Sequence, residues 1–199
     1  IYDDPGALSS GFTDFFKKLV EKHQAPFHLA LSGGSTPKCW FDFLADNERD
    51  WPHWSKVQLY WGDERCVPPD SAESNYGMTR HHLLDAVPNI AAHQVHRIYG
   101  ELDPGEAASR YCTVLDADLP KRRHVPRFDL VMLGVGSDGH TASVFPDQLH
   151  RWNSTPWCFA TAHPETKQSR VTLSGKVINN SAHVVFLVQG ASKAAILGA

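Results

Sequence analysis

The sequence predicts an α/β protein with a largely parallel central sheet that is covered by helices on both faces. Short apolar runs of four to six residues, rich in β-branched and aromatic side chains, alternate along the chain with amphipathic stretches of helical length. Most of these apolar runs close on Gly or Ser. Strand, loop and helix repeated in this order is typical of parallel sheets whose strands are joined by crossover helices.

Five strands and five principal helices are expected in chain order. The strands are expected at 27–31, 57–61, 128–133, 170–173 and 183–188. The helices are expected at 6–23, 37–47, 75–84, 104–117 and 175–180, with a final helix beginning after residue 190. No internal repeat divides the chain, so residues 1–199 are expected to form one domain. Because the chain starts at Ile1 and stops inside an expected helix, we expect missing N-terminal residues and a missing C-terminal tail.

Composition narrows the class of protein. The 19 Lys and Arg residues against 22 Asp and Glu residues give a net charge of −3, whereas a nucleic-acid-binding protein usually carries a basic excess. No apolar run reaches the roughly 20 residues of a membrane span. The four cysteines lie far apart and form no C-x-x-C pair, which is typical of reduced thiols in a cytoplasmic protein.

The first functional loop, 32–37, follows the first expected strand. It reads Ser-Gly-Gly-Ser-Thr-Pro, and its glycines Gly33 and Gly34 allow backbone N–H groups to approach a ligand closely. Thr36 is expected to cap the next helix, with Pro37 at the first helical position. Because unpaired N–H groups and the helix dipole face such a turn, the loop favours a phosphate site; a plain tight turn is the alternative.

The second loop follows the strand at 57–61 and carries three adjacent charges, Asp63, Glu64 and Arg65. Charges at the end of a strand are costly when buried without partners. They are therefore either solvated or gathered around a polar ligand. Taken alone, the cluster is more typical of a solvated loop.

The third loop, 134–146, satisfies a dinucleotide-binding pattern literally through Gly134, Gly136 and Gly139. We reject that interpretation because Asp138 would press a carboxylate against a pyrophosphate and because Pro146 shortens the helix that should follow. The pattern also belongs on an early strand–helix unit, with an acidic residue about 20 positions further on.

The same loop holds Asp138 and His140 between glycines at the tip of a strand. A histidine there is well placed for proton transfer near neutral pH, although a lone histidine is more often structural. Two later cations, Arg170 and Lys193, would supply positive charge for a phosphate dianion if they face the same site, and are ordinary surface charges otherwise. The paired histidines at 81–82 and 93–96 lack a third ligand at a suitable spacing, so no metal is expected.

Taken together and in order, these segments resemble the 6-phosphogluconolactonases. The matching segments are 32–37, 61–68, 74–76, 134–146, 170–173 and 190–194. The resemblance implies a Rossmann-like three-layer α/β/α fold and hydrolysis of 6-phospho-D-glucono-1,5-lactone in the oxidative pentose phosphate pathway. It also implies that no metal or organic cofactor takes part.

The resemblance implies roles for individual residues. Phosphate contacts fall on Gly33, Gly34, Ser35, Thr36, Arg170 and Lys193. His140 becomes the general base that activates water, and Asp63 and Arg65 lie on the substrate-facing loop. Asp138 either orients His140 or binds sugar hydroxyls, and Arg65 or a backbone N–H of the glycine-rich loop is expected to stabilise the developing oxyanion.

Two alternatives come from other functional classes. Amino-sugar phosphate deaminases or isomerases share the Asp-Gly-His segment but carry a glutamate shortly downstream, whereas here no carboxylate follows His140 before Asp147. A non-catalytic sugar-phosphate sensor would bind without turnover and usually carries a DNA-binding module, which residues 1–199 do not include unless such a module was cut off. A monomer whose partner is a small phosphorylated lactone is the expected state, with no nucleic acid and no membrane.

Overall fold

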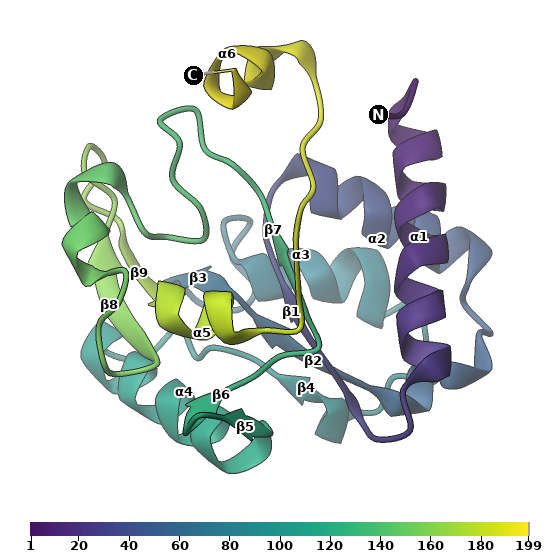
Figure 1. The fold of residues 1–199 in the computed structure, drawn as a ribbon, viewed down its shortest axis with the longest axis horizontal. Coiled ribbons are helices and arrows are strands. Elements are labelled where there is room, and N and C mark those ends of the chain that lie inside the picture. The colour runs from purple at the N-terminus through teal and green to yellow at the C-terminus, as the bar shows by residue number, and fades with distance from the viewer. Residues whose placement is uncertain (199) are drawn as a thin grey trace.

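The computed structural model of the chain describes residues 1–198 and has a five-stranded parallel sheet at its centre (Figure 1). The strand order is β10-β7-β1-β2-β4. The strands are β1 (Phe27–Leu31), β2 (Val57–Trp61), β4 (Val95–His96), β7 (Leu130–Leu133) and β10 (His183–Phe186). The α/β class and the parallel sheet predicted from the sequence are therefore confirmed.

The order of the strands creates a crevice at the middle of the sheet. From β1 the chain builds outward to β2 and β4 on one side, and then returns to place β7 and β10 on the other. The loops after β1 and β7 therefore leave the sheet side by side and diverge. In open parallel sheets, ligands bind at the carboxyl ends of the strands where the order reverses in this way.

Helices cover both faces of the sheet (Figure 1). The α-helices are α1 (Pro5–Lys22), α2 (Ser35–Asn47), α3 (Asn75–Thr79), α4 (Pro104–Asp118), α5 (Gly175–Asn180) and α6 (Ala194–Leu197). Helices α1 and α2 lie on one side of the sheet, and α4 and α5 lie on the other. Helix α1 begins one residue earlier than the expected start at residue 6, because the side chain of Asp4 accepts a hydrogen bond from the N–H of Ala7 and Pro5 opens the first turn.

Short helical turns complete the connections. They are η1 (Pro52–Lys56), the π-helical η2 (Arg80–Leu84), η3 (Ala92–Gln94), η4 (Pro146–Arg151) and η5 (Ala191–Lys193). The helix expected over 75–84 is thus α3 continued by the π turn η2. A small hairpin of β5 (Lys121–Arg122) and β6 (Val125–Pro126) precedes β7.

One expected strand of the parallel sheet lies elsewhere. The segment predicted as a strand at 170–173 is β9 (Ser169–Leu173), which pairs antiparallel with β3 (Asp63–Arg65) and β8 (Cys158–Ala162) in a second sheet. The prediction was wrong about the sheet because β9 has partners on both sides that no local pattern identifies. This second sheet brings the charged segment after β2 directly against Arg170.

Helix α2 begins two residues earlier than predicted. Gly34, with a φ of +106°, occupies the position before the first helical residue, Ser35, and Thr36 makes no side-chain capping bond. The expectation that Thr36 caps the helix was therefore wrong. A left-handed backbone conformation is accessible to glycine at little cost, so the turn itself replaces the side-chain cap.

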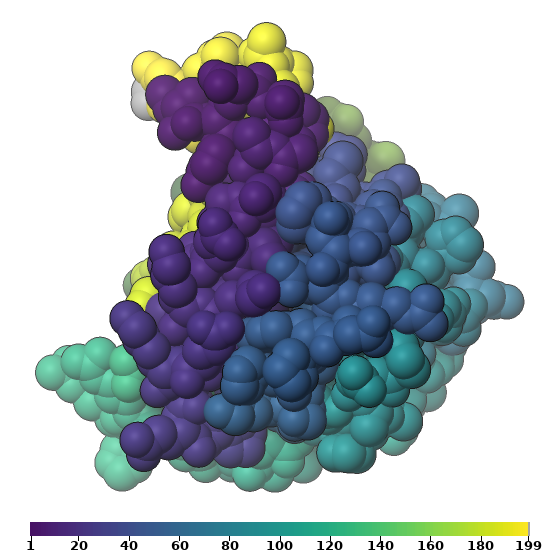
Figure 2. All heavy atoms as spheres, turned by 90° about the vertical axis from the view of Figure 1, so that its right-hand side faces the viewer, coloured from purple at the N-terminus to yellow at the C-terminus, as the bar shows by residue number. Residues whose placement is uncertain are grey.

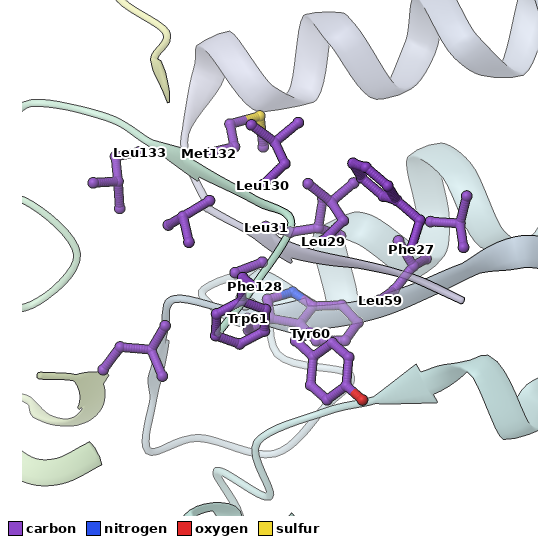
Figure 3. Close-up of a cluster of buried hydrophobic side chains, with 14 of the residues drawn as sticks. Phe27, Leu29, Leu31, Leu59, Tyr60, Trp61, Phe128, Leu130, Met132 and Leu133 are labelled. Carbon is purple, nitrogen blue, oxygen red and sulfur yellow. The ribbon is translucent and has the colours of Figure 1, made fainter. Parts of the chain in front are cut away.

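The core is one continuous cluster between the sheet and its helices (Figure 3). All five residues of β1 and all four of β7 are buried, as expected for strands covered on both faces. Strand β10 is different, because it is the edge of the sheet and most of its residues are exposed. Near this edge the N-terminal residues lie close to the segment around 186–197, as the neighbouring purple and yellow atoms of Figure 2 show.

No helix within residues 1–198 is long and apolar enough to cross a membrane.

Candidate active site

A cleft of about 140 Å³ opens at the carboxyl ends of β1, β2 and β7, at the point where the strand order reverses. It is lined by Ser32, Gly33, Gly34, Asp63, Arg65, Asn75, Gly134, Val135, Gly136, His140, Ala142 and Arg170. The three loops singled out from the sequence therefore meet in one place, together with a residue of the second sheet.

The first wall of the cleft is the glycine turn before α2. Gly33 and Gly34 line the cleft, and the first turn of the 13-residue helix α2 begins directly behind them. The leading N–H groups of a helix have no partner within the helix, and its dipole places partial positive charge at the same end. This wall therefore favours an anionic group.

The second wall carries two arginines. Arg65 on β3 and Arg170 on β9 are directly opposite each other in an antiparallel pair, and both line the cleft. Like charges in this arrangement repel each other. Burial lowers the pKa of Arg170 below its usual value, the charge of Arg65 adds to this effect, and the carboxylate of Asp63 opposes it. Two guanidinium groups that repel each other at the edge of one cleft favour binding of an anion, because the anion accepts their hydrogen bonds and offsets their charge.

Each arginine has donor capacity left over. Arg65 donates from Nη1 to the carbonyl of Glu73 at 2.5 Å, and Arg170 donates to the oxygens of Ser143 (3.4 Å) and Gln168 (3.2 Å). Within residues 1–198, the buried Nε of each arginine has no hydrogen-bond partner. The guanidinium groups are thus held in place without being saturated.

Asp63 is buried between these elements and is fixed by its neighbours. Its Oδ2 accepts a hydrogen bond from Ser143 Oγ at 2.6 Å and lies 4.0 Å from Nη1 of Arg170. Its backbone carbonyl accepts from Nδ2 of Asn75 at 2.9 Å. Asp63 therefore ties together the arginine wall, the loop after His140 and the segment that carries Asn75.

Glu64 anchors the segment at 74–76 from below. The residue is 2% exposed. Its carboxylate accepts hydrogen bonds from the backbone N–H groups of Arg65 (2.8 Å), Asn75 (2.7 Å) and Tyr76 (2.8 Å), and from Ser74 Oγ at 3.1 Å. Burial raises the pKa of Glu64 above its usual value, and the three backbone hydrogen bonds oppose that rise. Glu64 does not line the cleft, so it positions residues that do.

Asn75 lines the cleft and, among residues 1–198, has an unpaired, buried acceptor. Its Nδ2 donates to Asp63, which fixes the orientation of the amide, and within the described residues its buried Oδ1 has no partner. That oxygen lies so close to Gly33 that a Cβ at residue 33 would collide with it. Buried polar atoms normally have a partner, so this oxygen is suited to accept a hydrogen bond from a ligand.

The third wall holds the pair Asp138 and His140. Nδ1 of His140 lies 2.5 Å from Oδ1 of Asp138, and the backbone N–H of His140 donates to the same oxygen at 3.2 Å. Although partial burial raises the pKa of Asp138, the hydrogen bonds from His140 outweigh it and hold that pKa below its usual value. Because an ionised carboxylate only accepts, Nδ1 carries the proton, and Nε2 is the free basic nitrogen of the neutral ring.

The backbone around this pair is closely packed. Gly136 donates its N–H to the carbonyl of His140 at 2.8 Å, and a Cβ at residue 136 would collide with Nδ1 of His140. The ring of His140 also packs against Phe145 at 4.7 Å between centroids. Glycine at 136 is therefore required for the imidazole to reach its position.

Comparison with known proteins identifies the family. The family model described as "Glucosamine-6-phosphate isomerases/6-phosphogluconolactonase" matches residues 5–199. The chain belongs to this family. The resemblance found in the sequence, and the enzyme class that it implies, are confirmed at this level.

Relatives within the family are similar over most of the chain. The 6-phosphogluconolactonase of Treponema pallidum is 39% identical over 193 residues, which cover 97% of this chain and 79% of the relative. That of Haemophilus influenzae is 40% identical over 173 residues, covering 86% and 72%. The solved 6-phosphogluconolactonase of Trypanosoma brucei is 32% identical with a TM-score of 0.84, covering 97% of this chain and 82% of that one.

The residues of this family member that the sequence singled out are only partly brought together. Gly33, Gly34, Asp63, Arg65, His140 and Arg170 line the cleft, and Asp138 supports His140 from behind. Ser35 lines an adjoining hollow instead, and Thr36 faces the contact between α1 and α2. Lys193 does not line the cleft; it ends η5, on the segment whose following helix α6 places Ile196 beside Gly139.

Three contributors to the family site were not assigned from the sequence. The sequence alone indicates no individual role for Asn75, Glu64 or Ser143. Their functions depend on contacts with Asp63 and with the backbone of 74–76, which only the second sheet creates. Among residues 1–198 no group of three or more His, Cys, Asp or Glu side chains is arranged to hold a metal ion.

Proposed function

We propose that the chain hydrolyses 6-phospho-D-glucono-1,5-lactone to 6-phospho-D-gluconate in the oxidative pentose phosphate pathway. The curated relatives at 39% and 40% identity carry the name 6-phosphogluconolactonase. The observation that carries the proposal is that an anion-binding wall and a carboxylate-supported histidine share one cleft. A phosphorylated lactone needs both, because it has a dianion at one end and a reactive ester carbonyl at the other.

The phosphate binds at the glycine turn and Arg170. The N-terminal N–H groups of α2 and a guanidinium group together provide several donors and positive charge for a dianion. Lys193 contributes only if the segment at 190–197 shifts toward the cleft, because its present position is outside the lining residues. Fixing the phosphate holds the carbonyl carbon in front of His140, and such positioning lowers the barrier substantially.

His140 activates the water. Its Nε2 takes a proton while the water oxygen bonds to the carbonyl carbon, and Asp138 stabilises the imidazolium that forms. The carbon–oxygen bond of the ring then breaks, and the proton on Nε2 passes to the departing ring oxygen. The products are a carboxylic acid and a hydroxyl on the same molecule, and the imidazole returns to its neutral form. The acid then loses its proton to solvent and becomes the carboxylate.

Arg65 stabilises the negative charge that develops on the carbonyl oxygen, since it lies beside Arg170 and has unused donor capacity. The free oxygen of Asn75 accepts a hydrogen bond from a sugar hydroxyl, which a phosphate or carboxylate cannot donate. Asp63 holds Arg65 and Asn75 in position and takes no part in bond making or breaking. The proposed reaction uses neither a metal nor an organic cofactor.

The alternative activity in this family is isomerisation of an amino-sugar phosphate. That reaction moves a proton between neighbouring carbons and needs a further acid near the histidine. The first carboxylate after His140 is Asp147, which is exposed on η4 and does not line the cleft. A non-catalytic sensor would bind the lactone without hydrolysing it, so only a measured turnover distinguishes it from the proposed enzyme. The monomeric state and the cytoplasmic location stay predictions.

The test is an assay of lactone disappearance corrected for spontaneous hydrolysis. His140→Gln should lower kcat by roughly 10²–10⁴-fold, whereas His150→Gln on the exposed η4 should leave it unchanged. Arg170→Ala should raise KM for the phosphorylated lactone more than for glucono-1,5-lactone, which lacks the phosphate. An unchanged kcat in His140→Gln, or equal KM effects on the two lactones, would contradict the respective assignment.

A further inference from the structure

Two cysteines meet outside the cleft. Cys112 lies on α4, and Cys158 begins β8, which packs against α4. Their Sγ atoms are 2.9 Å apart, although 46 positions separate them in the sequence. Both are free thiols, and neither lines the cleft or enters the proposed mechanism.

The two thiols are in different environments. Cys158 is fully buried, and its Sγ lies 3.0 Å from the carbonyl of Ala108. Cys112 is half-buried, and its sulfur accepts a hydrogen bond from the backbone N–H of Cys158 at 3.2 Å. Cys112 is thus the member of the pair that a small solute can reach, and its own thiol also lies 3.3 Å from the carbonyl oxygen of Cys158, to which it can donate.

This arrangement makes Cys112 the nucleophile and Cys158 the second thiol of a disulfide. The hydrogen bond from Cys158 lowers the pKa of Cys112, with burial opposing the change, whereas the same contact and burial raise the pKa of Cys158. The thiolate is the reactive form of cysteine, so Cys112 reacts first. Cys158 remains protonated directly beside it and serves as the second thiol.

We propose that Cys112 and Cys158 are an oxidation site, at which a peroxide converts the two thiols into an intramolecular disulfide. The Cys112 thiolate attacks one peroxide oxygen, the O–O bond breaks, and a sulfenic acid and hydroxide form. The sulfur of Cys158 then bonds to that of Cys112, the S–O bond breaks, and water leaves with the thiol proton. The two sulfurs lose two electrons and hydrogen peroxide gains them, giving two water molecules in all.

Little movement is needed for the bond to form. The sulfur atoms must approach from 2.9 Å to about 2.05 Å, the length of a disulfide bond. The cross-link would tie α4 to β8, whose residue Thr161 pairs with Arg170 on β9. Because it closes a long loop of the chain, the bond restricts the unfolded state and raises the melting temperature of the oxidised protein.

The other two cysteines provide an internal control. Cys66 is half-buried, and burial beside the negative charges of Glu64 and Asp103 raises its pKa to about 11, so it is a poor nucleophile. No hydrogen bond joins the sulfur of Cys39 to another cysteine among residues 1–198. Oxidation should therefore consume the thiols of Cys112 and Cys158 and leave those of Cys39 and Cys66.

The experiment treats the whole chain with a small excess of hydrogen peroxide. Titration with a thiol reagent should fall from four reactive cysteines in denaturant to two, and the intact mass should fall by about 2 Da, the mass of two hydrogens. Peptide mapping should join the segments that contain Cys112 and Cys158. Dithiothreitol should restore all four thiols and remove the rise in melting temperature.

Three variants separate this site from general oxidation. Cys112→Ser and Cys158→Ser should each abolish the cross-link, while Cys39→Ser should keep it and leave a single thiol after oxidation. Mapping of the unsubstituted protein remains decisive if the buried Cys158→Ser variant does not fold. Oxygen addition without loss of 2 Da, a link between two chains, or a link through Cys39 or Cys66 would overturn the proposal.

Discussion

Replacing Asp138 with asparagine tests how the histidine of the cleft is activated. The carboxylate is 2.5 Å from Nδ1 of His140 and also accepts the backbone N–H of that residue. Asparagine has nearly the same shape, so the loop should keep its conformation while the negative charge is removed. An amide can also donate to Nδ1, which would move the ring proton to Nε2 and block the basic nitrogen.

The size of the effect follows from geometry and exposure. Two unit charges about 4 Å apart interact by about 1 kcal/mol in water and by about 4 kcal/mol at a typical protein surface. The side chains of Asp138 and His140 are 40% and 22% exposed, so solvent screens the pair and a value of about 1–2 kcal/mol applies. About 1.4 kcal/mol corresponds to a tenfold change in rate. The loss of charge, together with the shift of the ring proton onto Nε2, should therefore lower kcat about 10–100-fold.

The assay is the initial rate of lactone hydrolysis at saturating substrate, with the spontaneous rate subtracted. Asp138→Asn should lower kcat with little change in KM, because the change affects the reacting group and not the phosphate site. In a His140→Gln background the same substitution should have almost no further effect, since the two residues act as one unit. A full effect in that background, or unchanged kcat in the single variant, would refute the assigned role.

Three further predictions concern the supports of the cleft and of the sheet. Tyr111→Phe should lower the free energy of unfolding in urea by about 2–4 kcal/mol, because it leaves the buried N–H and C=O of Trp61 unpaired. Asn75→Ala should lower kcat/KM by about 5–30-fold through loss of one hydroxyl contact, measured with folding checked by circular dichroism. Hydrogen bonds from His28 outweigh burial and lower the pKa of Asp129, so its stabilising effect is present at neutral pH and is lost as pH falls through the folded value. The difference in unfolding free energy between the unsubstituted protein and Asp129→Asn should therefore narrow below about pH 4.

Local patterns predicted those parts of the fold that local physics determines. Strands β1, β2 and β7 are apolar because helices cover them on both faces, and this burial is visible as short apolar runs. Helices α1 and α4 begin at Asp-Pro pairs whose carboxylates cap the first turn. The loops after these strands could then be assigned to one edge of the sheet.

The second sheet could not be predicted in the same way. Strand β3 is only Asp63–Arg65, three charged residues that resemble a solvated loop until β9 pairs with them. That pairing joins segments more than a hundred positions apart, and no periodicity encodes it. The interpretation of the charged cluster as solvated was therefore wrong for Asp63 and Glu64, which are 5% and 2% exposed.

The roles of Asn75 and Ser143 depend on this same pairing. Their hydrogen bonds to Asp63 exist only because Asp63 is buried under β9. Conversely, Thr36 looked like a helix cap by residue type, but the left-handed conformation of Gly34 starts α2 earlier. Residue type predicted which side chains are available for chemistry, and the tertiary pairing determined which of them act together.

The opposed arginines of β3 and β9 have a thermodynamic consequence for the protein as a whole. The two guanidinium groups repel each other whenever no anion is bound, and negative charge on a ligand, the phosphate at Arg170 or the developing oxyanion at Arg65, would relieve this repulsion. Relief of this repulsion would therefore contribute part of the free energy of binding a phosphorylated molecule. By mutual linkage, such a molecule protects the native chain against heat, and high ionic strength weakens that protection.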